Sequence, residues 1–189
     1  MASHPLLYDS LTNRQAAILS IGIAVATIAI GIAVPVALGQ PPQAFRIACA
    51  VAFYIPLSIN AWIDARKHVL LKNWTHLAYG IWFIALFLGN YPVSSVVWAI
   101  AVGVPVVAAS KFSGGRLIGL GDARLLVVLA GWNGLWAPWG TLTMLAIAFG
   151  THGLYLLMRS LRMRMTLRDR HPLGPWLVAG SWIAWALTG

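Results

Sequence analysis

The 189-residue chain contains only four acidic residues, all of them aspartates, and two adjoin long apolar runs. Asp64 stands in the segment AWIDARKH and Asp122 in LIGLGDARLL. Two carboxyl groups within a few ångströms of each other cannot both ionise cheaply, so one keeps a proton while the other stays charged. Such a pair is an acid and a base that can activate water and protonate an amide leaving group without a covalent intermediate. Asp64 and Asp122 are therefore the first candidates for chemistry.

The composition assigns the chain to a membrane. Hydrophobic residues make up 60% of it, charged residues 9%, and the mean hydropathy is +0.79, which excludes a water-soluble globule. Backbone amides inside a bilayer must be satisfied internally, so long apolar runs without the alternation of a β-barrel predict helices. We therefore predict an all-α, polytopic membrane bundle.

Seven apolar stretches predict about seven transmembrane helices. They run from Ala16 to Leu38, Ala44 to Ile63, Trp74 to Leu88, Pro92 to Ala109, Leu117 to Trp132, Trp136 to Met158 and Gly174 to Leu187. The first exceeds the roughly 7 to 15 apolar residues of a signal peptide, so we predict a retained helix. The chain is predicted to be one membrane domain, 1–189, with an extra helix in 1–43 ahead of a two-aspartate core over 44–189.

Six tryptophans fall near the predicted helix ends, as an aromatic belt at the membrane surface requires. They are Trp62, Trp74, Trp132, Trp136, Trp139 and Trp176. We expect their rings to lie at the membrane–water interface.

Lysines and arginines orient the predicted bundle. Of the 13 basic residues, all but Arg46 precede the first helix or lie at connections on its side, which the positive-inside rule makes cytoplasmic. The opposite connections, GQPPQ, GNYP and WNGLWAP, carry no charge. The N-terminus is thus predicted inside, with Asp64 and Asp122 at the same cytoplasmic boundary. Because topology explains the net charge of +9, nucleic-acid binding is not expected.

Three motifs around the aspartates resemble one protein family. GLGDARL over 119–125, with Asp122, is similar to the GxGD-x-K-L signature of the type IV prepilin peptidases, which are intramembrane-type aspartic proteases. Asp64 followed by LKN over 71–73 is similar to the family's aspartate followed by Ile-Pro-Asn. PLGP over 172–175 is similar to the Pro-Phe-Gly-Pro element before the family's last helix. The motifs occur in the family's order from about Cys49 to the C-terminus.

The resemblance implies an aspartic endopeptidase in which Asp64 and Asp122 remove the leader peptide of a prepilin-like membrane protein. Cleavage would occur at the cytoplasmic face of the inner membrane, after a glycine, in pilus biogenesis or protein secretion. Lys72 replaces the proline of the first motif, and Arg124 replaces the lysine of the second. Larger members carry a cytoplasmic insertion with paired cysteines and also methylate the new N-terminus. The lone Cys49 and the lack of that insertion imply a compact peptidase without methyltransferase activity.

Five further residues are candidates for binding the substrate or tuning the aspartates. Gly119 and Gly121 allow close approach to a neighbouring helix or an extended peptide. Lys67 and Arg124 can bind an acidic residue of a substrate, although topology already accounts for such charges. Asn73 is expected to cap the third helix or to orient a carboxylate.

Two other functions fit the composition. A proton-coupled transporter or channel would relay protons through Asp64, Asp122 and His152, whereas a structural membrane subunit would need no chemistry. A histidine within a span, as His152 is predicted to be, more commonly bonds a neighbouring helix. Transport sites tend to lie near the midplane, whereas both aspartates are predicted at the cytoplasmic end. No Walker loop, HExxH motif or CxxC pair occurs, so no metal or cofactor is expected.

Overall fold

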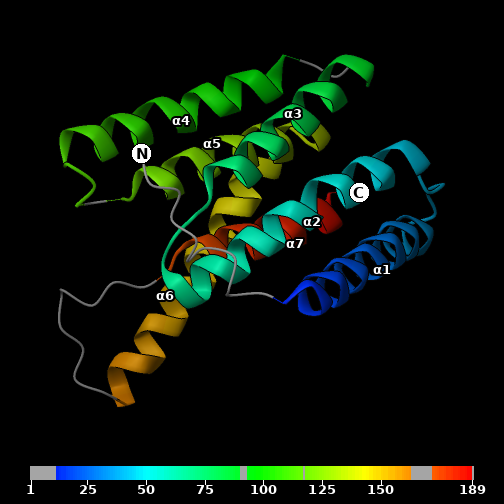
Figure 1. The fold of residues 1–189 in the computed structure, drawn as a ribbon. Helices are drawn as coiled ribbons and strands as arrows, with labels where there is room; N and C mark the ends of the chain where they lie inside the picture. The colour runs from blue at the N-terminus through cyan, green and yellow to red at the C-terminus, as the bar shows by residue number, and fades with distance from the viewer. Residues whose placement is uncertain (1–11, 90–92, 117, 163–171, 189) are drawn as a thin grey trace.

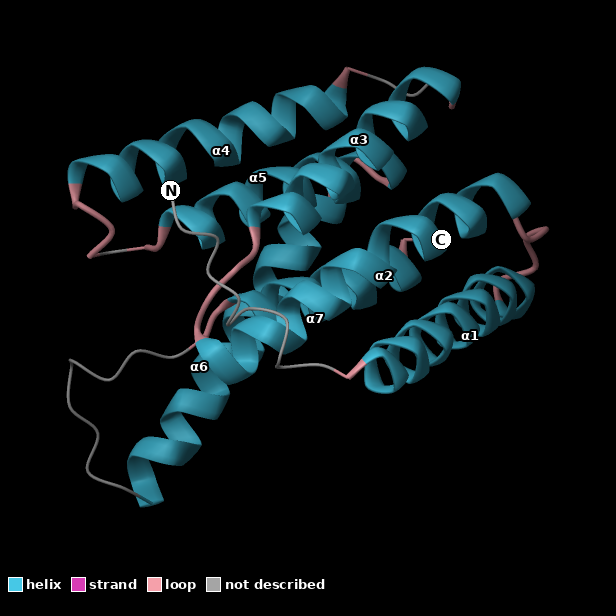
Figure 2. Cartoon of the chain, viewed as in Figure 1, coloured by secondary structure: helices cyan, strands magenta, loops and turns pink. Residues whose placement is uncertain are grey.

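Seven helices make up the computed structural model, which describes residues 12–89, 93–116, 118–162 and 172–188 (Figure 1). They are α1 (Asn13–Ala37), α2 (Ala44–Lys67), α3 (Lys72–Leu88), α4 (Ser94–Phe112), α5 (Leu120–Trp136), α6 (Gly140–Arg162) and α7 (Gly174–Leu187). Loops join them, and no strand occurs among the described residues (Figure 2). The predicted all-α class is confirmed. Asp9 and Asp169 lie outside the described residues.

Each predicted apolar stretch corresponds to one helix, and two of the ends differ in a way that matters for the aspartates. The apolar run predicts an end at Ile63, whereas α2 continues to Lys67 and holds Asp64 in its last turns. Likewise, α5 begins at Leu120 instead of Leu117, so Asp122 lies in its first turn. Polar side chains on a terminal turn can reach water, so a helix need not end where its apolar run does. Both aspartates are therefore held on helical backbone.

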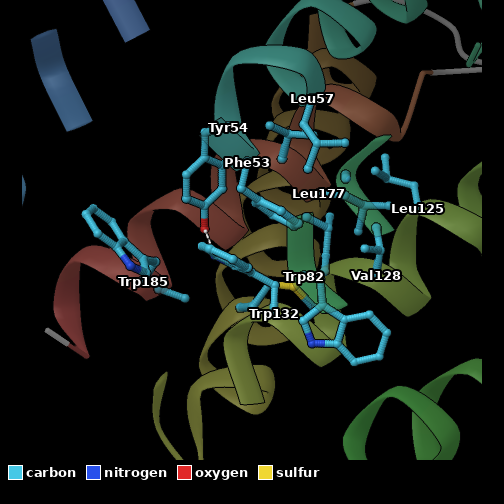
Figure 3. Packing of buried hydrophobic residues seen from close by; sticks show 14 of the residues in the cluster. Phe53, Tyr54, Leu57, Trp82, Leu125, Val128, Trp132, Leu177 and Trp185 are labelled. Atoms are coloured by element: carbon cyan, nitrogen blue, oxygen red, sulfur yellow. Dashed lines mark hydrogen bonds between the residues drawn. The ribbon is translucent and has the colours of Figure 1, made fainter. Parts of the chain in front are cut away.

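Helix α5 lies at the centre of the bundle, packed against α3, α4, α6 and α7. Phe53 on α2 stacks on Trp132 of α5 with 4.0 Å between ring centroids (Figure 3). Trp132 is fully buried. Its predicted place in an interfacial aromatic belt is therefore wrong, because α5 extends a full turn beyond it, to Trp136, and packs it against α2.

Buried hydrogen bonds tie together α2, α5 and α7. The Tyr54 hydroxyl donates to the Ser181 carbonyl oxygen over 3.0 Å, and the Trp132 indole N–H donates to Tyr54 Oη over 3.1 Å (Figure 3). The Asn133 side-chain amide donates to Ser181 Oγ over 2.7 Å. In an apolar bundle such bonds fix helices that the hydrophobic effect alone would not hold in register. These three helices carry the residues of the candidate site at their other ends.

Within the described residues, four helices are long and apolar enough to cross a membrane: Arg14–Ala37, Ala44–Lys67, Ser94–Phe112 and Gly140–Leu161. The other three contain 17, 17 and 14 residues, shorter than the roughly 20 of a typical span. Exposed isoleucines and valines along α1 fit contact with lipid. The chain thus has the character of a membrane protein, while the predicted seven spans and their orientation remain predictions.

Arg46, the one basic residue that departs from the charge pattern, has a structural partner. It is only 7% exposed, at the start of α2, and its Nη2 donates to the Trp185 carbonyl oxygen over 2.6 Å. Its Nη1 donates to the Thr188 carbonyl oxygen over 3.3 Å. The guanidinium also lies 5.3 Å and 5.2 Å from the ring centroids of Trp136 and Trp185. Arg46 therefore caps the C-terminal end of α7, where carbonyl groups lack helical partners and favour a cation.

Changing Arg46 to methionine is expected to lower the free energy of unfolding by about 2 to 3 kcal/mol, because it removes two charged hydrogen bonds to carbonyl oxygens at the end of α7 and a cation beside Trp136 and Trp185. Unfolding of the purified protein in detergent measures the change. Arg14→Met is the control, since Arg14 is exposed and its loss should shift stability by no more than about 0.5 kcal/mol. Equal effects of the two substitutions would contradict the capping role.

Candidate active site

The Asp64 carboxylate lies at the N-terminus of α7. The buried backbone N–H of Gly174 donates to Asp64 Oδ2 over 3.2 Å, and Asp64 is only 5% exposed. The first N–H groups of a helix have no helical acceptor and carry positive partial charge, so they favour an anion. Because Pro175 has no N–H, Gly174 supplies the one backbone donor of the first two residues of α7. The α7 N-terminus thereby offsets the unfavourable place of Asp64 near the C-terminal end of α2.

Asp122 lies in the first turn of α5, close enough to Asp64 for their charges to repel. Its side chain is half-buried, and Oδ1 is buried without a hydrogen-bond partner among the described residues. A buried carboxyl oxygen without a partner is rare, and it favours binding of a proton donor or a proton at that atom. The two aspartates from distant parts of the chain therefore form one pair at the same end of the bundle.

Leu70, in the α2–α3 connection, lies where α5 and α7 begin. A Cβ atom at Gly121 would lie 3.1 Å from Leu70 Cβ, and one at Gly174 would lie 3.2 Å from Leu70 Cδ2. Glycine at both positions lets the connection approach the two helix starts closely. This packing draws the end of α2, which carries Asp64, towards Asp122.

Gly119, the N-cap of α5, provides space for the Asp122 carboxylate. A Cβ atom at Gly119 would lie 3.2 Å from Asp122 Oδ2. A larger side chain at Gly119 would crowd the Asp122 carboxylate. The two glycines before Asp122 thus have distinct tasks: Gly119 leaves room for the carboxylate, and Gly121 admits Leu70.

Asn60, which the sequence analysis missed, shapes the connection after Asp64. Its Oδ1 accepts a hydrogen bond from the Leu71 N–H over 2.8 Å, and its Nδ2 donates to the Leu71 carbonyl oxygen over 3.3 Å and to Thr75 Oγ1 over 3.2 Å. The predicted capping role of Asn73 is wrong, because Leu71 is the N-cap of α3 and no side chain caps it. Asn73 is exposed in the first turn. The signal for Asn60 was a polar amide inside an apolar run, one turn before Asp64.

The basic candidates lie on the two helices that carry the aspartates, Arg66 and Lys67 on α2 and Arg124 on α5. The Arg66 guanidinium lies over the Trp62 ring, 4.7 Å from its centroid. Arg124 is half-buried on α5, and its carbonyl oxygen accepts a hydrogen bond from the Tyr79 hydroxyl over 3.0 Å. Lys67 is half-buried as the last residue of α2. Cationic residues therefore share the end of α2 with Asp64 and the start of α5 with Asp122, where they can attract an acidic segment.

His68 ends α2 in a left-handed conformation, with φ 54° and ψ 38°, and its N–H donates to the Asp64 carbonyl oxygen over 2.8 Å. Among the described residues it is the one non-glycine residue at positive φ. Because glycine adopts this conformation freely, His68→Gly is expected to raise the free energy of unfolding by about 0.5 to 1 kcal/mol. Lys67→Gly, inside the helix, should lower it by about 1 kcal/mol. Chemical denaturation in detergent compares the two, and a loss in both would contradict the strain at His68.

His152 packs against a neighbouring helix. Its ring centroid lies 5.6 Å from that of Trp176 on α7, and Tyr155 lies 5.2 Å from the same tryptophan. This packing supports the start of α7, two residues after Gly174. Cys49 is a free thiol on α2, partly buried against the core.

Comparisons of the chain with models of known families, with curated proteins and with solved structures found no match. No group of three or more metal-binding side chains occurs among the described residues. The arrangement that the structure does contain is a pair of interacting carboxyl groups, one hydrogen-bonded to a helix N-terminus and one with a buried oxygen available.

Proposed function

We propose that this chain is a membrane-embedded aspartic endopeptidase that removes the leader peptide of type IV prepilin-like proteins at the cytoplasmic membrane face. The observation that carries the proposal is the convergence of Asp64 and Asp122 at one end of the bundle. The three motifs that resemble the prepilin peptidases meet there as well, since Leu70 and Gly174 join the connection after Asp64 to the starts of α5 and α7.

The proposed reaction uses the two carboxyl groups in different states. The Gly174 N–H favours the ionised form of Asp64, which accepts a proton from an attacking water. The water oxygen bonds to the carbonyl carbon of the peptide bond, and Asp122, the acid, donates a proton from its buried Oδ1 to the amide nitrogen. The C–N bond then breaks, so that the leader leaves with a new carboxyl group and the rest of the substrate with a free amine. The pair titrates as a unit, so acid and base roles exchange as the proton moves.

The proposed topology places this chemistry at the inner surface of the cytoplasmic membrane, with the N-terminus inside. All of the described basic residues except Arg46 lie at the start of α1, the ends of α2, α4 and α6, the starts of α3 and α5, or the α4–α5 connection. The positive-inside rule makes that end cytoplasmic. No methyl transfer is proposed, and the expected partners are the substrate and the lipid bilayer.

Co-expression with a prepilin-like protein tests the proposal. The wild-type chain is expected to shorten the substrate by the mass of its leader, with a new N-terminus after a glycine. Proton-driven solute uptake that Asp64→Asn and Asp122→Asn abolish, without any peptide product, would instead favour the transporter. An unchanged substrate mass across several prepilin-like proteins would overturn the peptidase proposal.

A further inference from the structure

An apolar groove of about 670 Å³ runs along the outside of the bundle between α3 and α4. Both helices pack on α5, and they meet near the start of α4, where the Trp82 indole N–H donates to Ser95 Oγ over 2.9 Å. Beyond that contact α5 forms the groove's floor. Trp82 and Phe83 form the α3 wall, and Val127 lies on the floor. In Figure 1, α4 lies at the edge of the bundle and α3 beside α5. The groove therefore opens towards the surroundings of the bundle.

The α4 wall of the groove extends over most of the thickness of a membrane core. Its lining extends from Val96 to Phe112, which is roughly 24 Å of helix at about 1.5 Å per residue. The hydrocarbon core of a bilayer is about 30 Å thick. A lipid acyl chain reaches across only one leaflet, whereas a transmembrane helix fills a groove along its whole length. The dimensions favour a helix.

The groove ends at the level of the aspartate pair. Lys111 and Phe112 line it at the end of α4, and the chain returns from there to Asp122 at the start of the neighbouring α5. Lys111 is exposed, is the one charged residue among the described lining residues, and forms no ion pair within the described part of the chain. A cation at the inner mouth of an apolar groove complements an apolar helix with an acidic residue near its cytoplasmic end.

We propose that this groove receives the apolar transmembrane helix of the substrate, with an acidic side chain at its cytoplasmic end paired with Lys111. This inference rests on the proposed function, because the occupant is the substrate of that reaction. A helix seated between α3 and α4 leaves its cytoplasmic flank beside the pair. The segment to be cut then extends over the start of α5 as non-helical chain, which exposes its peptide bond to attack.

Disulfide cross-linking tests the occupant independently of catalysis. Val104 lies in the groove and Val25 on the lipid-facing side of α1, and they are 63% and 61% exposed. Val104→Cys and Val25→Cys are made in Cys49→Ala, Asp122→Asn protein and reconstituted in phosphatidylethanolamine–phosphatidylglycerol vesicles. The probe is a single-pass prepilin-like protein with one cysteine in its apolar helix. A cross-link is expected at Val104→Cys and only background at Val25→Cys. Equal yields, or a disulfide joining two copies of this chain at Val104→Cys, would overturn the proposal.

A charge exchange tests the Lys111 contact in the active protein. Lys111→Glu is expected to lower kcat/KM by about threefold to fivefold, the worth of one exposed ion pair, and changing the substrate's acid to lysine should restore it. Arg14→Glu, at an exposed cytoplasmic residue outside the groove, is the control and should not respond to the substrate change. No rescue by the exchange would remove Lys111 from the proposal. Cleavage without a cross-link at Val104→Cys would refute the groove alone, and a cross-link without cleavage would refute the peptidase alone.

Discussion

Changing either Asp64 or Asp122 to asparagine is expected to lower kcat/KM for leader removal by about 10³-fold or more. One carboxyl group must take a proton from water and the other must give one to the leaving amine, and an amide side chain does neither. Because the two act as a unit, the double variant is expected to be about as slow as either single variant. The mass of a co-expressed prepilin-like protein reports the loss.

The matched controls are Asp9→Asn and Asp169→Asn, which remove the other two carboxylates of the chain and should leave cleavage intact. Both test substitutions keep the shape of the side chain, and asparagine at position 64 still offers an oxygen to the Gly174 N–H. The thermal unfolding of each variant should therefore stay close to that of the wild-type chain. Retained cleavage in Asp64→Asn or Asp122→Asn would sink the proposed mechanism.

The pattern of apolar runs and basic connections predicted that two aspartates distant in the chain lie at the same end of the bundle. Asp64 and Asp122 are far apart in the chain, and the predicted spans together with the positive-inside rule assigned both to one boundary. The structure brings them to one end of the bundle. Alternation of apolar runs and connections carries this information, because each helix reverses the chain's direction. The one residue that broke the pattern, Arg46, has a capping role that depends on where α7 ends.

Side-chain contacts between helices could not be predicted in the same way. Trp132 was assigned to an interface because it ended an apolar run, yet α5 continues and stacks it on Phe53. Asn73 matched a motif, but Asn60 binds the connection after Asp64. Nothing in the sequence distinguishes Leu70 from other large apolar residues in connections, so its packing role could not be predicted. Its role follows from the two glycines that face it, and such pairings exist only in three dimensions.

Gly174→Ala is expected to lower kcat/KM by about 10²-fold while changing the free energy of unfolding by less than about 1 kcal/mol. The new methyl group would lie 2.6 Å from Asp64 Oδ2 and 3.3 Å from its Cγ. The atom that gives way is the end of a flexible side chain, so the carboxylate turns aside and the backbone stays in place. Asp64 then loses its hydrogen bond and its alignment with Asp122. Cleavage assays with denaturation in detergent separate the two effects.

Gly180→Ala on the same helix is the matched control with the opposite outcome. Its methyl group would lie 2.7 Å from Ala148 Cβ and 2.9 Å from Ala148 Cα and N. Backbone of α6 cannot rotate away, so this substitution should cost about 1 to 3 kcal/mol of unfolding free energy. Cleavage per folded molecule should be retained, because Gly180 lies almost two turns beyond the start of α7. If both variants lost stability and activity together, Gly174 would be only a packing residue and not a positioning group for Asp64.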